Sequence, residues 1–139
     1  TKQLELNGLL KQYLQDYEEV YDYRNIEVTI DEQDIFNVTM NESLAVALLT
    51  NLLKNAFVHN IDGGHIRITV TKNSITFRNS GVENPLDKEH IFERFYQGTK
   101  KEGSTGLGLA IADSICRLQH LSIRYYFEQE EHCFEISRQ

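Results

Sequence analysis

The sequence predicts an α/β (α+β) two-layer sandwich, a mixed and mainly antiparallel sheet with three helices on one face. Seven short segments alternate apolar and polar residues as half-buried strands do, and three longer ones have apolar residues at helical spacing. Most strand segments follow one another across short turns, which favours antiparallel hairpins. At 139 residues, the chain is predicted to form one domain over 1–139.

The first 40 residues predict a strand, a helix and a hairpin. Residues 4–6 alternate, and Asn7 is a good N-cap for an amphipathic helix that runs to Tyr21. Segments 26–30 and 35–40 alternate again, with turn-like Asp-Glu-Gln-Asp between them. We therefore expect these two strands to pair as a hairpin.

The middle of the chain predicts a buried helix and a second hairpin. Residues 41–60 are largely apolar, contain no Pro or Gly, and are too many for a strand. Asp-Gly-Gly at 62–64 ends this helix. Segments 66–70 and 75–77 then alternate on either side of a Lys-Asn turn.

The stretch from Val82 to Glu102 has no strand pattern. A connection this long in a compact domain is usually a functional lid or disordered. Its apolar residues are Ile91, Phe92, Phe95 and Tyr96. The two phenylalanines favour a segment that docks, and Asp87 is placed to cap a short helix. Residues 107–118 then predict the third helix, and 123–127 with 134–136 a closing hairpin.

Composition disfavours several classes of partner. Fourteen Lys and Arg against 21 Asp and Glu give a net charge of −7, which disfavours binding to nucleic acid or an anionic membrane face. No apolar run approaches the roughly twenty residues that span a bilayer. Cys116 and Cys133 lack a CxxC partner, so we expect reduced core thiols of an intracellular domain. The chain begins at Thr1 inside a predicted strand, as a piece of a larger protein does.

Residues 103–110, Gly-Ser-Thr-Gly-Leu-Gly-Leu-Ala, predict a glycine loop that opens directly into a helix. Glycines let a backbone approach a bulky anion, and the N–H groups of a first helical turn favour negative charge. The stretch therefore indicates a phosphate cradle. Taken alone, it is equally typical of a flexible turn.

Asn51, Asn55 and His59 recur every four residues and share one stripe of the middle helix. Their amides are either structural, bonding loop backbone, or hard oxygen ligands for a cation that also contacts phosphate. Because Mg²⁺ takes only one or two protein oxygens besides water and phosphate, one Asn carbonyl suffices. The structural explanation is favoured for Asn51, and both remain open for Asn55.

Asn79-Ser80-Gly81 ends a predicted strand. The Asn79 carbonyl can accept a hydrogen bond from an exocyclic amine, and Gly81 would let a flat ring approach the backbone. A β-turn is the simpler explanation for this tripeptide by itself.

Together these stretches resemble the ATP-binding catalytic domain of bacterial sensor histidine kinases. The sequence is similar to the N box at Asn51-Leu-Leu-Lys-Asn55-Ala, the first glycine box at Asn79-Ser-Gly81, the F box at Phe92-Glu-Arg-Phe95 and the second glycine box at Gly103-Ser-Thr-Gly-Leu-Gly108-Leu. The resemblance covers about residues 41–118, in the family's order. It implies the Bergerat fold of gyrase, mismatch-repair and chaperone ATPases, with an ATP lid at about 82–104. It also implies that the dimerisation, phosphoacceptor and sensor domains lie outside this chain.

The resemblance assigns site residues one by one. Asn55 matches the Mg²⁺ ligand and Asn51 the other N-box Asn near the phosphates, which makes both catalytic candidates. The ATP-binding candidates are Asn55, His59, Asn79, Gly81, Phe92, Arg94, Phe95, Lys100, Lys101, Thr105, Gly106, Leu107 and Gly108. Among them, Gly106 and Gly108 match glycines whose backbone meets the phosphates, and Phe92 and Phe95 match aromatic anchors of the lid.

Three positions depart from the family pattern. Asn79 stands where Asp is usual, so it keeps an acceptor oxygen but lacks charge, and Glu83 replaces a glycine. Val58 replaces the N-box lysine. The candidate replacement cations in the lid are Arg94, Lys100 and Lys101. For the two lysines, a solvated surface run is an equal explanation.

The resemblance implies transfer of the ATP γ-phosphate rather than hydrolysis. ATPase relatives carry a glutamate base where this chain has Asn51, and an amide is not a base. Neutral imidazole already carries a lone pair and is a suitable acceptor. None of the five histidines is followed by Glu or Asp, as the family's phosphoacceptor is. We expect His65, His90, His120 and His132 to be surface or turn residues.

The expected function is donation of phosphate from Mg-ATP to a histidine on a separate dimerisation domain. A response regulator would then be an indirect partner, the location cytoplasmic, and the parent protein anchored in the inner membrane. The alternatives are a related ATPase, an anti-sigma-type serine kinase, or a nucleotide-binding module that has lost catalysis.

Overall fold

The predicted order of strands and helices is confirmed in the computed structural model, which describes residues 1–82, 85–96 and 107–139. In chain order the elements are β1 (Lys2–Glu5), α1 (Leu6–Val20), the 3-10 helix η1 (Asp22–Arg24), β2 (Glu27–Glu32), β3 (Asn37–Met40), α2 (Glu42–Val58), β4 (His65–Val70), β5 (Ser74–Asn79), α3 (Gly108–Leu118), β6 (Leu121–Glu128) and β7 (Glu131–Arg138).

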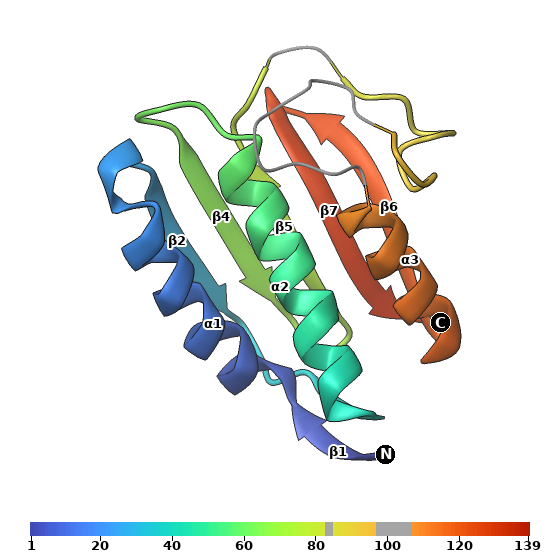
Figure 1. Cartoon of the computed structure of the whole chain (residues 1–139). Coiled ribbons are helices and arrows are strands. Elements are labelled where there is room, and N and C mark those ends of the chain that lie inside the picture. Colours follow the sequence, from blue (N-terminus) through green and yellow to red (C-terminus); the bar gives the residue numbers. More distant parts are fainter. Residues whose placement is uncertain (83–84, 97–106) are drawn as a thin grey trace.

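Five strands form the main sheet in the order β2-β4-β5-β7-β6. The β2–β4 pair is parallel and the other three pairs are antiparallel, while β1 and β3 form a separate two-stranded sheet. Figure 1 shows α1, α2 and α3 side by side on one face of the main sheet. The predicted fold class, a two-layer sandwich with three helices on one face, is confirmed.

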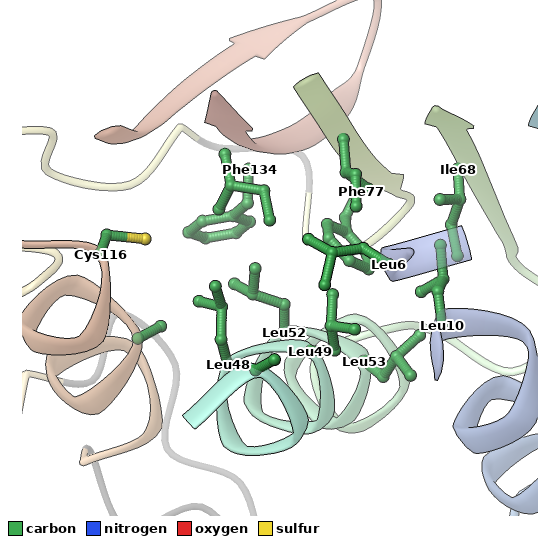
Figure 2. Packing of buried hydrophobic residues seen from close by; sticks show 14 of the residues in the cluster. Leu6, Leu10, Leu48, Leu49, Leu52, Leu53, Ile68, Phe77, Cys116 and Phe134 are labelled. Atoms are coloured by element: carbon green, nitrogen blue, oxygen red, sulfur yellow. The ribbon is translucent and has the colours of Figure 1, made fainter. Parts of the chain in front are cut away.

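Helix α2 is the centre of the core. Its N-cap is Asn41, whose side-chain oxygen Oδ1 accepts the Leu44 N–H at 3.0 Å. Figure 2 shows leucines of α2 lying below Phe77 of β5 and Phe134 of β7, with Leu6 and Leu10 of α1 and Cys116 of α3 around them. Those labelled on α2 are Leu48, Leu49, Leu52 and Leu53, each at most 1% exposed. An apolar run without Pro or Gly thus became a helix buried between the sheet and its neighbours.

Both cysteines are buried free thiols, as the sequence predicted. Burial raises the pKa of Cys116 to about 12 and that of Cys133 to about 11. Because the thiolate is the reactive form, these cysteines act as small apolar core residues.

The hairpin predicted for residues 26–40 is wrong. Strand β2 pairs in parallel with β4, and β3 pairs with β1 in the small sheet. The chain leaves the main sheet after Glu32, where the Gln33 N–H bonds the Val70 carbonyl at 2.9 Å. Alternation identified both strands correctly, but it carries no information about the partner of each strand.

Asn7 explains this change of direction, and its predicted role as N-cap is also wrong. Helix α1 begins at Leu6 with Glu5 as N-cap, and Asn7 is 1% exposed. The Asn7 amide donates to Glu32 (3.0 Å) and to the Asp34 carbonyl (3.0 Å), and its oxygen accepts the Phe36 N–H (2.9 Å). It therefore fastens the β2–β3 connection to α1.

The described part of the connection after β5, residues 85–96, consists of turns. Asp87 accepts the Glu89 N–H at 2.9 Å, as a capping residue does, and its carbonyl accepts the Ile91 N–H at 2.9 Å. The short helix expected after Asp87 is not formed within these described residues.

A buried carboxylate ties β7 to β4 on the face of the sheet opposite the helices. Glu131 is 5% exposed and accepts two hydrogen bonds from Arg67, at 2.9 and 2.6 Å. His65 Nε2 lies 2.7 Å from the same carboxylate. The Arg67 bonds, followed by the His65 bond, hold the pKa of Glu131 below its ordinary value although burial opposes this.

Glu131→Gln is expected to lower the free energy of unfolding at pH 7 by about 1–2 kcal/mol, because Arg67 is half-exposed and solvent screens part of the pair. A carboxyl with a lowered folded-state pKa stabilises the fold above its ordinary pKa of 4.5. That contribution is lost as the pH falls through the lowered pKa. Urea unfolding at pH 7 and pH 3.5 checks this. The stability gap between variant and wild type should narrow at the lower pH, and the exposed turn variant Glu130→Gln should show no gap. An equal gap at both pH values would contradict the assignment.

Candidate active site

The candidate residues of three elements meet at one end of the sandwich. This end holds the C-terminal half of α2, the end of β5 and the start of α3, at the top of Figure 1. The described part of the predicted lid, Val82 and residues 85–96, leaves β5 at the same end. The sequence motifs are therefore brought together by the fold, although they are far apart along the chain.

Asn51 on α2 faces Gly108 at the start of α3. A Cβ atom added to Gly108 would lie 3.0 Å from Asn51 Oδ1, so the two helices approach closely because residue 108 lacks a side chain. Asn51 also donates to the Ala47 carbonyl at 2.7 Å, which agrees with the structural explanation favoured for its amide. Its oxygen is left facing Gly108.

The start of helix α3 lacks negative side-chain charge. Its N-cap, Leu107, makes no side-chain capping bond, and the first turn holds no acidic residue. The N–H groups of a first turn have no partner within the helix, so this end favours an anion. Among the described residues, Gly108 and Leu107 therefore occupy positions consistent with a phosphate cradle. The candidates Lys100, Lys101, Thr105 and Gly106 lie outside the described residues, as does Glu83.

Asn55 lies one helical turn beyond Asn51 and is half-buried. The hydrogen bonds that the described residues make with it are those of the helix, including His59 N–H to the Asn55 carbonyl at 3.1 Å. Among the described residues, none hydrogen-bonds its side-chain oxygen, which can therefore meet a ligand. His59, the next residue of the stripe, forms the C-cap of α2.

Asn79 is the last residue of β5 and is 2% exposed, so it is a buried strand residue rather than the turn residue that its tripeptide favoured. Its Nδ2 donates to the Ser80 carbonyl at 2.8 Å. Its Oδ1 is buried and has no hydrogen-bond partner among the described residues. A buried acceptor without a donor costs about 1–3 kcal/mol, so this atom fits a donor from a ligand, such as an exocyclic amine.

Gly81 lets the end of β5 pass close to α2. A Cβ atom added there would lie 2.9 Å from the His59 carbonyl and 3.2 Å from His132 Cδ2. Residue 81 must therefore be small for Asn79 and the stripe of α2 to lie at this separation. The structure thus brings together Asn51 with Gly108, and His59 with Gly81.

Asn60 is part of this site and was missed in the sequence. It is fully buried, and its amide donates to the carbonyls of Ala56 (3.1 Å) and His65 (3.0 Å). Its oxygen accepts from Ser80 Oγ at 2.6 Å. The network joins the end of α2 to the residue between Asn79 and Gly81. A polar residue just past a helix gives no local indication of such burial.

Arg24 was also missed. Its guanidinium donates to the carbonyls of Phe57 (2.5 Å) and Asn60 (2.7 Å) and to Asp62 (2.8 Å). It thereby satisfies backbone acceptors at the C-terminus of α2, where a cation is favoured.

The F-box phenylalanines have different environments. Phe92 packs edge-on against Phe134, with ring centroids 6.3 Å apart, beside the buried Ile91. Phe95 is 65% exposed, has a left-handed backbone (φ 66°), and lies under the Arg94 guanidinium at 5.4 Å. The predicted docking of this segment is thus found, and it is made through Phe92 while Phe95 is exposed.

The histidines mostly lie where they were expected, with one exception. His90 is exposed in a turn, His120 is exposed with a left-handed backbone, and His65 is half-exposed. His132 is only 5% exposed, so its predicted place at the surface or in a turn is wrong. It faces Phe127 of β6 and Asn79 of β5 across the sheet register.

In the part of the chain that the structure describes, no helix has the length and apolarity needed to cross a membrane.

Comparisons with known proteins agree with this arrangement. Residues 40–137 match the family of histidine kinase-, DNA gyrase B-, and HSP90-like ATPases. The heme sensor protein HssS of Staphylococcus aureus (strain Newman) is 33% identical over 127 residues, which are 88% of this chain and 28% of HssS. The sensor histidine kinase RppB of Synechocystis sp. is 43% identical over 84 residues, covering 54% of this chain and 18% of RppB. The chain thus spans less than a third of each relative.

Among solved structures, the catalytic domain of histidine kinase ThkA superposes with a TM-score of 0.85 at 24% identity, covering 97% of this chain and 92% of that one. At this identity the likeness supports the fold alone.

Proposed function

Because the chain belongs to the family of histidine kinase-, DNA gyrase B-, and HSP90-like ATPases, we propose that it binds Mg-ATP and donates the γ-phosphate to a histidine on a separate dimerisation domain of the same sensor kinase. The observation that carries the proposal is the close approach of Asn51 to Gly108, with 3.0 Å between the amide oxygen and a Cβ added at residue 108. It supports the proposal because Asn51, the first residue of the N-box stripe, lies beside the start of α3, which favours an anion.

The adenine end of the site is assigned to Asn79 and Gly81. The unpartnered Asn79 Oδ1 would accept from the adenine amine, and Gly81 leaves space for the ring. The phosphate end is assigned to the start of α3 at Leu107 and Gly108, together with Gly106 and Thr105. His59, Phe92, Arg94, Phe95, Lys100 and Lys101 are proposed to surround the nucleotide.

The residues present fit a single Mg²⁺ ion held through Asn55, since a hard amide oxygen is a sufficient protein ligand when phosphate supplies the others. When bound, Mg²⁺ neutralises charge on the phosphate oxygens. The chain's own contribution is positioning: α2 and the start of α3 hold the phosphate end, and β5 holds the adenine end. Asn51 cannot activate water, which leaves the γ-phosphate for an incoming imidazole.

In the transfer step, the neutral imidazole nitrogen of the partner domain forms a bond to the γ-phosphorus. The bond from that phosphorus to the β,γ-bridging oxygen breaks, and ADP leaves with the electron pair. We further propose that residues 1–139 act as one catalytic domain with a lid at about 82–104. A response regulator is an indirect partner, the domain lies in the cytoplasm, and the parent kinase is anchored in the inner membrane.

The test supplies this chain with Mg-ATP labelled at the γ-phosphate and the histidine-containing domain of its parent kinase. Acid-labile phosphate is expected on the histidine domain when both chains are present, and little free phosphate when this chain is alone. Measured ATP binding without acid-labile phosphate would contradict the kinase proposal. Steady release of phosphate by this chain would favour an ATPase, and acid-stable phosphate on the partner would favour a serine kinase. Absence of Mg-dependent ATP binding would indicate a degenerate module.

A further inference from the structure

A chain of hydrogen bonds joins the β6–β7 hairpin to the backbone just after Gly81. His132 Nε2 lies 2.6 Å from the Val82 carbonyl, and His132 Nδ1 lies 2.8 Å from Tyr125 Oη. Tyr125 Oη in turn accepts the Leu86 N–H at 3.0 Å. His132 and Tyr125 are each 5% exposed. Two buried side chains therefore hold the backbone on both sides of residues 83–84.

One assignment of protons satisfies every group in this chain. The Val82 carbonyl can only accept, so His132 Nε2 carries the hydrogen. In a neutral imidazole Nδ1 is then the acceptor, and the Tyr125 hydroxyl donates to it. The hydroxyl oxygen keeps a lone pair for the Leu86 N–H. With this assignment each of these buried donors and acceptors has one partner. Removal of the His132 ring or of the Tyr125 hydroxyl therefore leaves other buried groups without a hydrogen bond.

These hydrogen bonds of His132 and Tyr125 lie directly beside the proposed adenine end of the site. His132 on β7 is the register partner of Asn79 on β5, so their side chains lie on the same face of the sheet. A Cβ atom added to Gly81 would lie 3.2 Å from the His132 ring. The same ring stacks with Tyr125, and Tyr125 packs on Phe134, which contacts Phe92.

We propose that His132 and Tyr125 are positioning residues for nucleotide binding, which fix the backbone at Val82 and at Leu86 beside the adenine end of the site. Both contacts are made with backbone groups, so they hold Val82, just past the end of β5, and Leu86, before the docked Phe92, against the β6–β7 hairpin. Without them, Val82 loses the bond that holds it against β7, one residue beyond Gly81. The inference rests on the proposed function, since it concerns the adenine end of that site.

The test compares Tyr125→Phe and His132→Phe with wild type by titration calorimetry, using ADP without Mg²⁺ and ATP with Mg²⁺. Tyr125→Phe removes one hydroxyl and is expected to weaken both nucleotides by the same factor, about three- to tenfold, the effect of one or two lost hydrogen bonds. His132→Phe is expected to weaken both by about 10- to 30-fold. His132→Gln, which has a donor and an acceptor, should recover part of the affinity.

The matched control is Tyr126→Phe. Tyr126 is the next residue of β6, points to the other face and lies under Arg124 at 4.6 Å, so its variant should bind both nucleotides as wild type does. A nitrogen NMR spectrum of the His132 ring is expected to show a protonated Nε2 and a bare Nδ1 in wild type, with Nδ1 shifted in Tyr125→Phe. A purely structural role would change the unfolding temperature without an equal loss for ADP and Mg-ATP.

The outcomes separate this inference from the proposed function. If wild type binds nucleotide and Tyr125→Phe binds it equally well, the inference alone is overturned. A loss of affinity in Tyr125→Phe for Mg-ATP but not for ADP would also overturn the inference alone. A wild-type chain that binds neither nucleotide would overturn the proposed function and the inference with it. Should His132→Phe fail to fold, Tyr125→Phe alone decides, because it removes a single oxygen atom.

Discussion

Asn55→Ala is expected to lower the rate of phosphoryl transfer from Mg-ATP by about 100- to 1,000-fold while leaving the fold intact. On the proposed function, Asn55 supplies the protein oxygen that holds Mg²⁺, and charge neutralisation by a bound metal contributes several kcal/mol to such a transition state. Asn55 is half-buried near the end of α2, and alanine is a better helix former than asparagine. The expected loss therefore comes from metal binding and not from unfolding. Single-turnover transfer to the histidine domain measures it.

Three comparisons sharpen this experiment. Lys54→Ala changes the adjacent exposed residue of the same helix and should transfer phosphate at the wild-type rate. Asn55→Asp restores a hard oxygen and should recover part of the rate, most clearly at raised Mg²⁺ concentration. ADP binding without Mg²⁺ should be unchanged in Asn55→Ala, because the adenine end is built from β5. An Asn55→Ala chain that transfers phosphate normally would remove Asn55 from the metal site.

Element types could be predicted because they depend on local spacing. The run of residues 41–60 contains neither Pro nor Gly and could only be a helix, and the short turns of β4–β5 and β6–β7 joined strands that do pair. The pairing of β2 with β4 could not be predicted in this way. Alternation shows that one face of a strand is buried, but it does not identify the partner strand. The bonds by which Asn7 ties the β2–β3 connection to α1 form only in the tertiary structure.

In the candidate site, too, residues that follow from local periodicity could be predicted, and residues that depend on tertiary contacts could not. The stripe of Asn51, Asn55 and His59 follows from helical periodicity, and the structure places its first member against Gly108. Asn60 could not be found, because its burial depends on Ser80 and His65 across the fold. His132 could have been found: it shares a strand face with Phe134 and Ile136, both of them core residues, so period-two alternation already directed it inward.

Gly64→Ala is expected to lower the free energy of unfolding by about 3–4 kcal/mol and to weaken nucleotide binding. An added Cβ atom would lie 2.2 Å from Asn60 Oδ1, 2.4 Å from Ser80 Oγ and 2.9 Å from the Ile61 carbonyl. To remove this steric overlap, the fully buried Asn60 must move and break the hydrogen bonds that join α2 to the end of β5. Overpacking costs about 1–3 kcal/mol and each buried polar group left unpaired about 1–3 kcal/mol more.

The neighbouring glycine is the matched control for this prediction. Gly63 has a left-handed backbone (φ 74°) with nothing within 4 Å of an added Cβ, so Gly63→Ala should cost only the backbone strain, about 1–2 kcal/mol. Urea unfolding of both variants separates steric overlap from backbone conformation. Since Ser80 lies between Asn79 and Gly81, the shift forced by Gly64→Ala reaches the adenine end of the site, and ADP affinity should fall with stability. If Gly64→Ala proved as mild as Gly63→Ala, Asn60 and Ser80 would separate at little cost and would not set the spacing between α2 and β5.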